Sequence, residues 1–363
     1  MSEVALTGAN GFVGWHTRAA LYGVQPSRTF SLGDGFHVDT ASSAINGAHR
    51  LVHIAGVNRG TDEEVREGNL LFAKQVAEAL TRSENPPPTV VFANSTQSGN
   101  GSVYGEAKRK ASDILRGATE KAGVQFEDVL LPNLFGEHGR PFYNAVTATF
   151  SHLLSQGEAP TVEHDKELCL LHVQDAADIL VGAVTPGESE SLHVRESVTG
   201  LLKRLTAIAK AYGRGDIPDI RSKFDRDLFN TYRSYTFPQQ APLSLQRHAD
   251  ARGSFFEILR THGGTGQSSF STTEPGISRG DHFHRRKIER FTVLAGTATI
   301  SLRKMFTNEA HEFRVTGESP VAVDMPTMWT HKITNTGNDT LYTSFWTNEI
   351  YDPSAPDTIP EPV

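Results

Sequence analysis

The sequence has only one cysteine, Cys169, among 363 residues, so no disulfide can form within the chain. No apolar run approaches the roughly twenty residues of a membrane span, and no basic leader precedes an apolar core. No basic cluster stands out against a net charge of −7, so neither nucleic acid nor a membrane is expected as a partner. We expect a soluble, cytoplasmic protein with room for two globular domains.

The first half of the chain alternates apolar runs with helical patterns. The predicted strands lie at 4–7, 29–32, 50–56 and 89–93, with a charged helix at 63–80. This alternation favours an α/β Rossmann-type domain with a doubly wound parallel sheet. From residue 244 the pattern changes to short alternating runs with frequent turns, as in an all-β barrel. The break at FPQQAPL, residues 237–243, predicts domains at 1–240 and 241–363.

A glycine turn, GANGFVG, joins the first predicted strand to a helix. Gly8, Gly11 and Gly14 would allow a tight turn, close approach to a pyrophosphate and close helix packing. The third strand ends in the small residues Ala55 and Gly56, which would let a nicotinamide dinucleotide lie across the sheet edge. The position between strand and helix makes this motif informative.

An acidic residue, Asp34, follows the second predicted strand about twenty residues after the glycine turn, where it would bind the adenosine ribose of NADH. Asp34 would repel the 2′-phosphate of NADPH, although Arg28 or Arg18 could still reach that phosphate. An ordinary turn residue is the alternative. Both NADH and NADPH therefore stay open.

Tyr104 and Lys108 are four residues apart, so they share one face of a helix. A nearby ammonium would favour the tyrosinate, Tyr104 would pass a proton to or from a sugar oxygen, and Ser95 would hydrogen-bond that oxygen. The bare pair is often a surface coincidence. After a glycine turn and a strand ending in Ser95, it resembles the Ser, Tyr-x-x-x-Lys triad of extended short-chain dehydrogenase/reductases.

That resemblance assigns further positions. Pro132 and Asn133 would lie beside the nicotinamide, and Asn144 would bind the phosphates of a nucleotide sugar. Asp175, in HVQDAADIL, is predicted to be a structural helix N-cap. The expected cofactor-binding set is Gly8, Gly11, Phe12, Gly14, Asp34, Ala55, Gly56, Lys108 and Pro132.

A metal site is predicted in the second half, from His282, His284, Glu289 and His331. Side chains two apart on a strand share a face, so the first two can converge on one ion, with Glu289 arriving from the next strand. The patterns G-x5-H-x-H-x4-E-x6-G and P-x4-H-x3-N resemble the two cupin motifs. Three imidazoles and a carboxylate suit Zn²⁺, Fe²⁺ or Mn²⁺, with zinc the first expectation. Without a thiolate, the set favours a catalytic ion over a structural one, although a chance cluster or a vestigial ion remain alternatives.

The segment DARGSFFEI, residues 250–258, with the RGDHFH run, also resembles dTDP-4-keto sugar 3,5-epimerases, which are cupins. Arg252 would then bind a diphosphate or a sugar oxygen. A salt bridge to Asp250 or Glu257 is an equal alternative.

The fusion, together with GVNRG, LPNLFG, YGEAK, RPFYNAV and WTNEIYDPSAPDT, resembles the CapF family of capsular polysaccharide enzymes over essentially the whole chain. The resemblance implies a homodimeric, bifunctional enzyme of UDP-N-acetyl-L-fucosamine synthesis, acting on a UDP-4-keto-6-deoxy-HexNAc. The cupin would epimerise C3 of this UDP-2-acetamido-2,6-dideoxy-4-hexulose, and the reductase domain would reduce C4 with NADPH.

Epimerisation must come first, because the C3 hydrogen is acidic only while C4 is a ketone. Lys304, Tyr342 and metal-bound water stay open as the group that moves this proton. Two other functions also stay open. One is an epimerase or dehydratase that retains NAD⁺ and has an accessory cupin, and the other is a non-catalytic cupin for dimerisation or sugar sensing.

Overall fold

The computed structural model describes residues 3–363, which form two compact units. The first unit comprises the residues up to 135, 143–145 and 167–196. The second comprises 136–142, 146–166 and 197–363. Each unit is described by itself.

The first unit is built on a five-stranded parallel sheet, as predicted. The strand order is β2 (Ser27–Thr29), β1 (Val4–Thr7), β3 (Arg50–His53), β4 (Thr89–Ser95) and β5 (Gln125–Leu131). Alternate residues face opposite sides, so Val4 and Leu6 join one core cluster while Ala5 joins the other. The three central strands, β1, β3 and β4, are mostly buried and largely apolar, whereas the edge strands β2 and β5 are more exposed and more polar.

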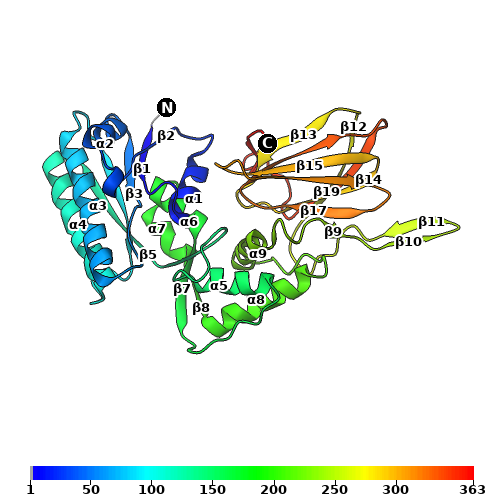
Figure 1. Cartoon of the computed structure of the whole chain (residues 1–363), viewed down its shortest axis with the longest axis horizontal. Helices are drawn as coiled ribbons and strands as arrows, with labels where there is room; N and C mark the ends of the chain where they lie inside the picture. Colours follow the sequence, from blue (N-terminus) through cyan, green and yellow to red (C-terminus); the bar gives the residue numbers. More distant parts are fainter. Residues whose placement is uncertain (1–2) are drawn as a thin grey trace. The chain divides into compact units, whose positions relative to one another are not determined.

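Helices cover both faces of this sheet (Figure 1). One core cluster contains residues of α1 (Phe12–Leu21) and α6 (Val173–Val181), and the other those of α2 (Val38–Ile45), α3 (Asp62–Arg82) and α4 (Val103–Ala122). A smaller sheet has β6 (Asn133–Phe135), β7 (Glu167–His172) and β8 (Val194–Ser197), with α7 (Pro186–Ser189) and the 3₁₀ turn η2 (Glu190–Leu192) before β8.

Three local predictions in this unit are wrong. The third strand ends at His53, so Ala55 and Gly56 lie in the loop after it. The second strand ends at Thr29, and the 3₁₀ turn η1 (Gly33–Gly35) follows because Gly33 has φ of 72° and its backbone N–H and C=O both bond Gln75 of α3. Asp175 is not an N-cap. The N-cap of α6 is His172, and Asp175 lies in the first turn, where a negative charge suits the helix dipole.

The second unit contains a jelly roll of two antiparallel five-stranded sheets. One sheet is ordered β12 (Gln267–Thr273), β19 (Leu341–Thr347), β14 (Glu289–Ala295), β17 (Val321–Met325), β9 (Leu243–Ser244). The other is ordered β16 (Ala310–Thr316), β15 (Thr297–Lys304), β18 (Trp329–Asn335), β13 (Ser278–Phe283), β20 (Ile359–Pro360). Inward side chains of both sheets, such as Ile300, Val323 and Trp329, form one apolar core. The hairpin of β10 (Arg247–Asp250) and β11 (Gly253–Phe256) stands away from the barrel (Figure 1).

Three helices that precede the predicted boundary belong to the same unit as the barrel: α5 (Val146–Ser155), α8 (Val198–Tyr212) and α9 (Lys223–Thr236). Arg233 of α9 donates to the Met325 carbonyl at 3.3 Å, and Arg290 of β14 donates to the Gly215 carbonyl at 2.7 Å. The two compact units therefore do not coincide with the predicted domains 1–240 and 241–363. The assignment of reduction to 1–240 and epimerisation to 241–363 stays a prediction.

Candidate active sites

The glycine turn forms a backbone cradle at the start of α1. Gly8 has φ of +70°, and a Cβ there would lie 2.6 Å from the Ala55 nitrogen. A Cβ at Gly14 would lie 2.0 Å from the Gly8 carbonyl oxygen. Gly11 is the N-cap of α1, so no side chain hydrogen-bonds the first backbone N–H groups of this helix. The turn thus brings bare backbone and a helix N-terminus to the β1 edge, which suits a pyrophosphate.

Polar side chains hold the neighbouring loop after β3. The Thr7 hydroxyl accepts from the backbone nitrogens of Ile54 and Ala55, at 3.1 and 3.3 Å. Buried Asn69 of α3 donates to the Val57 carbonyl at 2.6 Å. Sequence reasoning missed Asn69, although an asparagine inside the predicted helix was a usable sign.

The residues near the predicted ribose site differ in their partners. Asp34 is exposed in η1. Arg28 forms an ion pair with Glu3, and Arg18 donates to Asn10 of the glycine turn at 3.3 Å. The preference between NADH and NADPH therefore stays open.

Ser95 ends β4, and Tyr104 and Lys108 lie in the first two turns of α4. Burial raises the pKa of Tyr104, and a hydrogen bond with Ser95 opposes this shift. Ser95 and Tyr104 are thus brought together, but the pKa of Tyr104 is raised, so the expected shift toward the tyrosinate beside Lys108 is not seen. The Lys108 amine donates to the Ala93 carbonyl at 2.7 Å and lies 4.0 Å from the centroid of the Phe92 ring.

Lys108 is fully buried, and burial lowers its pKa to about 7, with Asp128 offsetting part of the effect. Asp128, on β5, is held by Asn94 and Ser112 at 2.8 and 2.6 Å. His53 stacks on Phe92, and burial and then the charge of Lys108 lower its pKa to about 3. Burial therefore favours the neutral form of His53, and that of Lys108 above about pH 7.

The expected substrate residues lie in different places. Asn133, on β6 directly after Pro132, donates to the Cys169 carbonyl at 3.2 Å. Asn144 has φ of 54° and donates at 3.3 Å to the carbonyl of Asn58, in the loop after β3. Arg252 lies on the β10–β11 hairpin, its side chain 90% exposed, and pairs with Asp250 at 2.6 Å.

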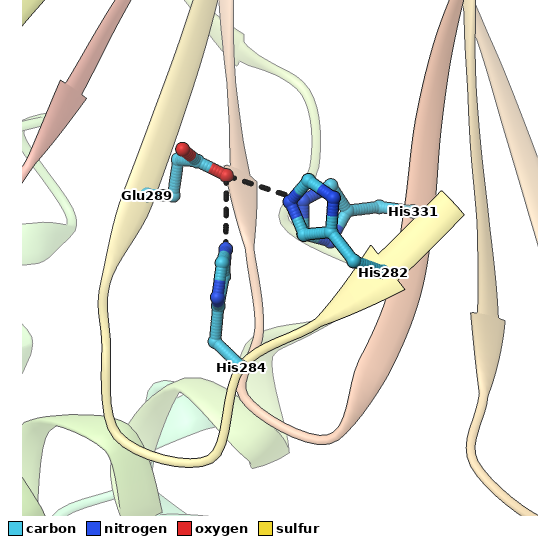
Figure 2. A group of neighbouring side chains, drawn as sticks. All are labelled: His282, His284, Glu289 and His331. Carbon is cyan, nitrogen blue, oxygen red and sulfur yellow. Dashed lines mark hydrogen bonds and ion pairs between the residues drawn. The ribbon is translucent and has the colours of Figure 1, made fainter. Parts of the chain in front are cut away.

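The four predicted metal ligands converge in the barrel, with their ligand atoms all within 4.8 Å of one another. His282 lies on β13, His284 directly after it, and His331 on the adjacent β18, whereas Glu289 begins β14 of the opposite sheet. The Nε2 atoms of His284 and His331 both lie 3.1 Å from one oxygen of Glu289 (Figure 2). The prediction that Glu289 arrives from the next strand is therefore consistent with this geometry.

The donor set fits a divalent ion. The second ring nitrogen of His284 contacts the Asp357 carbonyl at 2.5 Å, and that of His331 contacts the Trp329 carbonyl at 3.3 Å. Such contacts fix the tautomer and leave Nε2 free to bind metal. Burial would raise the pKa of Glu289, but His284 and His331 outweigh it and hold the pKa well below its usual range. Burial lowers the pKa of His282 to about 4, which favours the neutral ring that a metal requires.

The two side chains that were candidates for moving the C3 proton, Tyr342 and Lys304, lie on strands of opposite sheets. Tyr342 is 40% exposed and packs against exposed Phe270, on the outer face of its sheet, whereas its neighbour Leu341 is in the core. Lys304 ends β15, opposite Trp329. Tyr342 therefore points away from the barrel interior.

These observations define a class of protein: a short-chain dehydrogenase/reductase fold with a Ser, Tyr, Lys triad, followed by a cupin-like jelly roll. Family comparisons agree. The NAD dependent epimerase/dehydratase family matches residues 40–194, and the polysaccharide biosynthesis C-terminal domain matches 248–359. The family supports a nicotinamide cofactor. In the described part of the chain, no helix is long and apolar enough to cross a membrane.

Relatives that align over nearly the whole chain identify the family more specifically. A UDP-2-acetamido-2,6-beta-L-arabino-hexul-4-ose reductase from Pseudomonas aeruginosa is 30% identical, over 98% of this chain and 97% of that protein. The capsular polysaccharide assembling protein CapF from Staphylococcus aureus is 31% identical, with a TM-score of 0.63 and coverage of 99% of this chain and 100% of that one. CapF with the inhibitor 3-isopropenyl-tropolone is 29% identical, with a TM-score of 0.56 and coverage of 99% and 100%. The chain belongs to the CapF family.

Proposed function

We propose that the protein is a bifunctional nucleotide-sugar enzyme that epimerises C3 of a UDP-2-acetamido-2,6-dideoxy-4-hexulose and then reduces its C4 ketone. The observation that carries this proposal is the presence of two chemically different sites in one chain. Ser95 and Tyr104 meet beside the nucleotide cradle, and three histidines and a glutamate meet inside the barrel. The substrate class is supported by the Pseudomonas relative, which is named for reduction of such a 4-hexulose.

In the reductase site, Tyr104 donates a proton to the C4 oxygen while Ser95 hydrogen-bonds that oxygen. Burial raises the pKa of Tyr104, so the side chain starts in the protonated form that reduction needs. Lys108 orients the cofactor ribose and supports Tyr104. The nicotinamide, as NADPH or NADH, supplies the hydride when bound. Gly8, Gly14 and the N-terminus of α1 would hold its pyrophosphate.

In the barrel site, His282, His284, Glu289 and His331 would hold a divalent ion, with zinc the first candidate. Such an ion would act as a Lewis acid that makes the hydrogen beside the ketone more acidic. Because the C3 hydrogen loses its acidity once C4 is an alcohol, epimerisation precedes reduction. We assign reduction to residues 1–240 and epimerisation to 241–363.

We also propose that the enzyme works as a homodimer in the cytoplasm, in surface polysaccharide synthesis. The CapF family supports the pathway, since the Staphylococcus relative is named for capsular polysaccharide assembly. Asn133, Asn144 and Arg252 are proposed to contact the substrate. Light scattering of the purified chain tests the dimer directly.

The test uses a UDP-4-keto-6-deoxy-HexNAc in D₂O, with products followed by mass spectrometry and NMR. Without reduced nicotinamide, we expect deuterium at C3 and no change at C4. With it, we expect a C4 alcohol and one nicotinamide oxidised per sugar. Parallel reactions with NADPH and NADH determine the preferred cofactor; a tenfold preference corresponds to about 1.4 kcal/mol.

Two variants separate the sites. His282→Ala should lose deuterium exchange at C3 but still reduce pre-epimerised sugar, and Tyr104→Phe should do the reverse. Full C3 exchange in metal-free protein would contradict the metal site. Turnover without net nicotinamide consumption would instead indicate an epimerase that retains NAD⁺.

A further inference from the structure

The C-terminal segment makes an unusual contact with the loop that carries two of the metal-site residues. Residues 285–288 join His284 to Glu289. The carboxylate of Asp357 accepts three consecutive backbone N–H groups of this loop, those of Arg285, Arg286 and Lys287, at 3.0, 2.9 and 2.8 Å. The next amide, that of Ile288, donates to the side chain of Asn348 at 2.8 Å. Side chains thus satisfy every amide of the loop.

The backbone of Asp357 contacts the site as well. Its carbonyl oxygen lies 2.5 Å from Nδ1 of His284, so this ring donates from Nδ1 and presents Nε2 toward Glu289. Asp357 is 9% exposed and has φ of 44°, a conformation that costs free energy outside glycine. Asp357 therefore holds the loop and fixes the tautomer of His284, while its own backbone adopts an unfavourable conformation.

Neighbouring contacts hold the segment 355–358 in place. The Lys287 amine donates to the Pro356 carbonyl at 3.3 Å and contacts the Thr358 hydroxyl at 3.1 Å. Arg286 donates to the Ala355 carbonyl at 2.9 Å. Directly after the segment, β20 pairs with β13, the strand that carries His282. Contacts to the loop therefore come from residues before and after Asp357 in the C-terminal segment.

We propose that Asp357 is a positioning residue of the barrel metal site, and that residues 355–358 act as a clamp that holds His284 and Glu289 in ligand geometry. The inference rests on the proposed function, because it assumes that these residues bind a divalent ion. The clamp acts through backbone and ligand orientation, and Asp357 itself touches neither ion nor substrate. Outer residues of this kind typically change metal affinity by about 10–100-fold.

The test compares Asp357→Asn with Asp352→Asn in the full-length protein. An asparagine at 357 keeps the backbone carbonyl but turns an NH₂ group toward at least one of the three loop amides. Asp352 is a matched control, since it lies on the same tail and its carboxylate accepts from the backbone and the hydroxyl of Ser354, at 2.9 and 2.7 Å, rather than from the loop amides. Cobalt(II) titration reports affinity and, through the visible absorption bands, ligand geometry.

We expect wild type and Asp352→Asn to bind cobalt alike. Asp357→Asn should bind it about 10–100-fold more weakly, with altered bands. Hydrogen–deuterium exchange of residues 285–287 should be at least about tenfold faster in Asp357→Asn alone, with or without metal. A purely structural role would leave the absorption bands of the metal-loaded variant unchanged.

The two proposals fail differently. If wild type binds no divalent ion, the proposed metal site is refuted, and the proposed role of Asp357 is refuted with it. If wild type binds cobalt and Asp357→Asn binds it equally well with the same bands, only the clamp is overturned. Should Asp357→Asn fail to fold, Lys287→Met loosens the segment without touching the three amides. It should weaken cobalt binding toward the lower end of the range of about 10–100-fold, and unchanged binding would overturn the clamp.

Discussion

The buried Lys108 should lower the stability of the folded protein in a pH-dependent way, and Lys108→Met should reveal it. Its side chain is fully buried, and burial lowers its pKa from 10.5 to about 7. Between these two pH values, the unfolded chain binds a proton at Lys108 that the folded chain does not. Wild-type stability therefore rises with pH across this window, and the variant lacks that rise.

The gap between the two pKa values corresponds to about 5 kcal/mol of unfavourable free energy below pH 7. By pH 9.5 only about 1–2 kcal/mol of this remains. The variant also loses the bond to the Ala93 carbonyl, which costs about 1–3 kcal/mol at every pH. Lys108→Met should therefore be more stable than wild type by about 2–4 kcal/mol at pH 6, and neutral or less stable at pH 9.5.

Equilibrium urea unfolding at both pH values measures this difference, followed by far-UV circular dichroism, to which α3 and α4 contribute most as the longest helices. Lys110→Met is the matched control, because Lys110 lies on the same helix and is exposed. Its effect should not depend on pH. If the effect of Lys108→Met is equal within about 1 kcal/mol at the two pH values, Lys108 titrates near its ordinary pKa and the reasoning fails.

Three further predictions follow from individual contacts. Tyr104→Phe should lower C4 reduction about 10²–10⁴-fold and leave C3 exchange intact; near-normal reduction would remove Tyr104 from the chemistry. Gly14→Ala places a Cβ 2.0 Å from a carbonyl oxygen and should abolish nucleotide binding in a fluorescence titration, whereas Gly117→Ala, with open space around it, should bind normally. Asp324→Asn leaves Arg290 buried without its partner, 2.6 Å away in wild type, and should cost about 3–5 kcal/mol in urea unfolding; a smaller loss would mean the barrel adapts.

The features predictable from the sequence are those written in short-range spacing. The three glycines, the four-residue spacing of Tyr104 and Lys108, and the H-x-H pair each depend on local geometry alone. The parallel sheet follows from alternating apolar and helical segments, and the comparisons support it. His331 lies far along the chain from the other three ligands. It was predictable because the short motif around it, P-x4-H-x3-N, can be recognised by itself.

Long-range contacts were not predictable. Asp357 lies 70 or more residues from the three amides that it accepts, and no periodicity relates them. The packing of α9 with the barrel depends on Arg233 reaching Met325, 92 residues away. The early end of β2 depends on Gln75, 42 residues beyond Gly33. In each case a polar side chain satisfies a backbone group that only the folded chain brings near.

The protonation states of the reductase site bear on the direction of its reaction. Burial raises the pKa of Tyr104, which favours its neutral form, and lowers that of Lys108 to about 7, so that this amine is mostly neutral only above that pH. A reductase needs the neutral tyrosine as its proton donor at the start of each cycle. An epimerase that first oxidises its substrate instead needs the tyrosinate at that step. The raised pKa of Tyr104 thus suits a proton donor in C4 reduction, and the nicotinamide consumed per sugar distinguishes this role from an internal redox cycle.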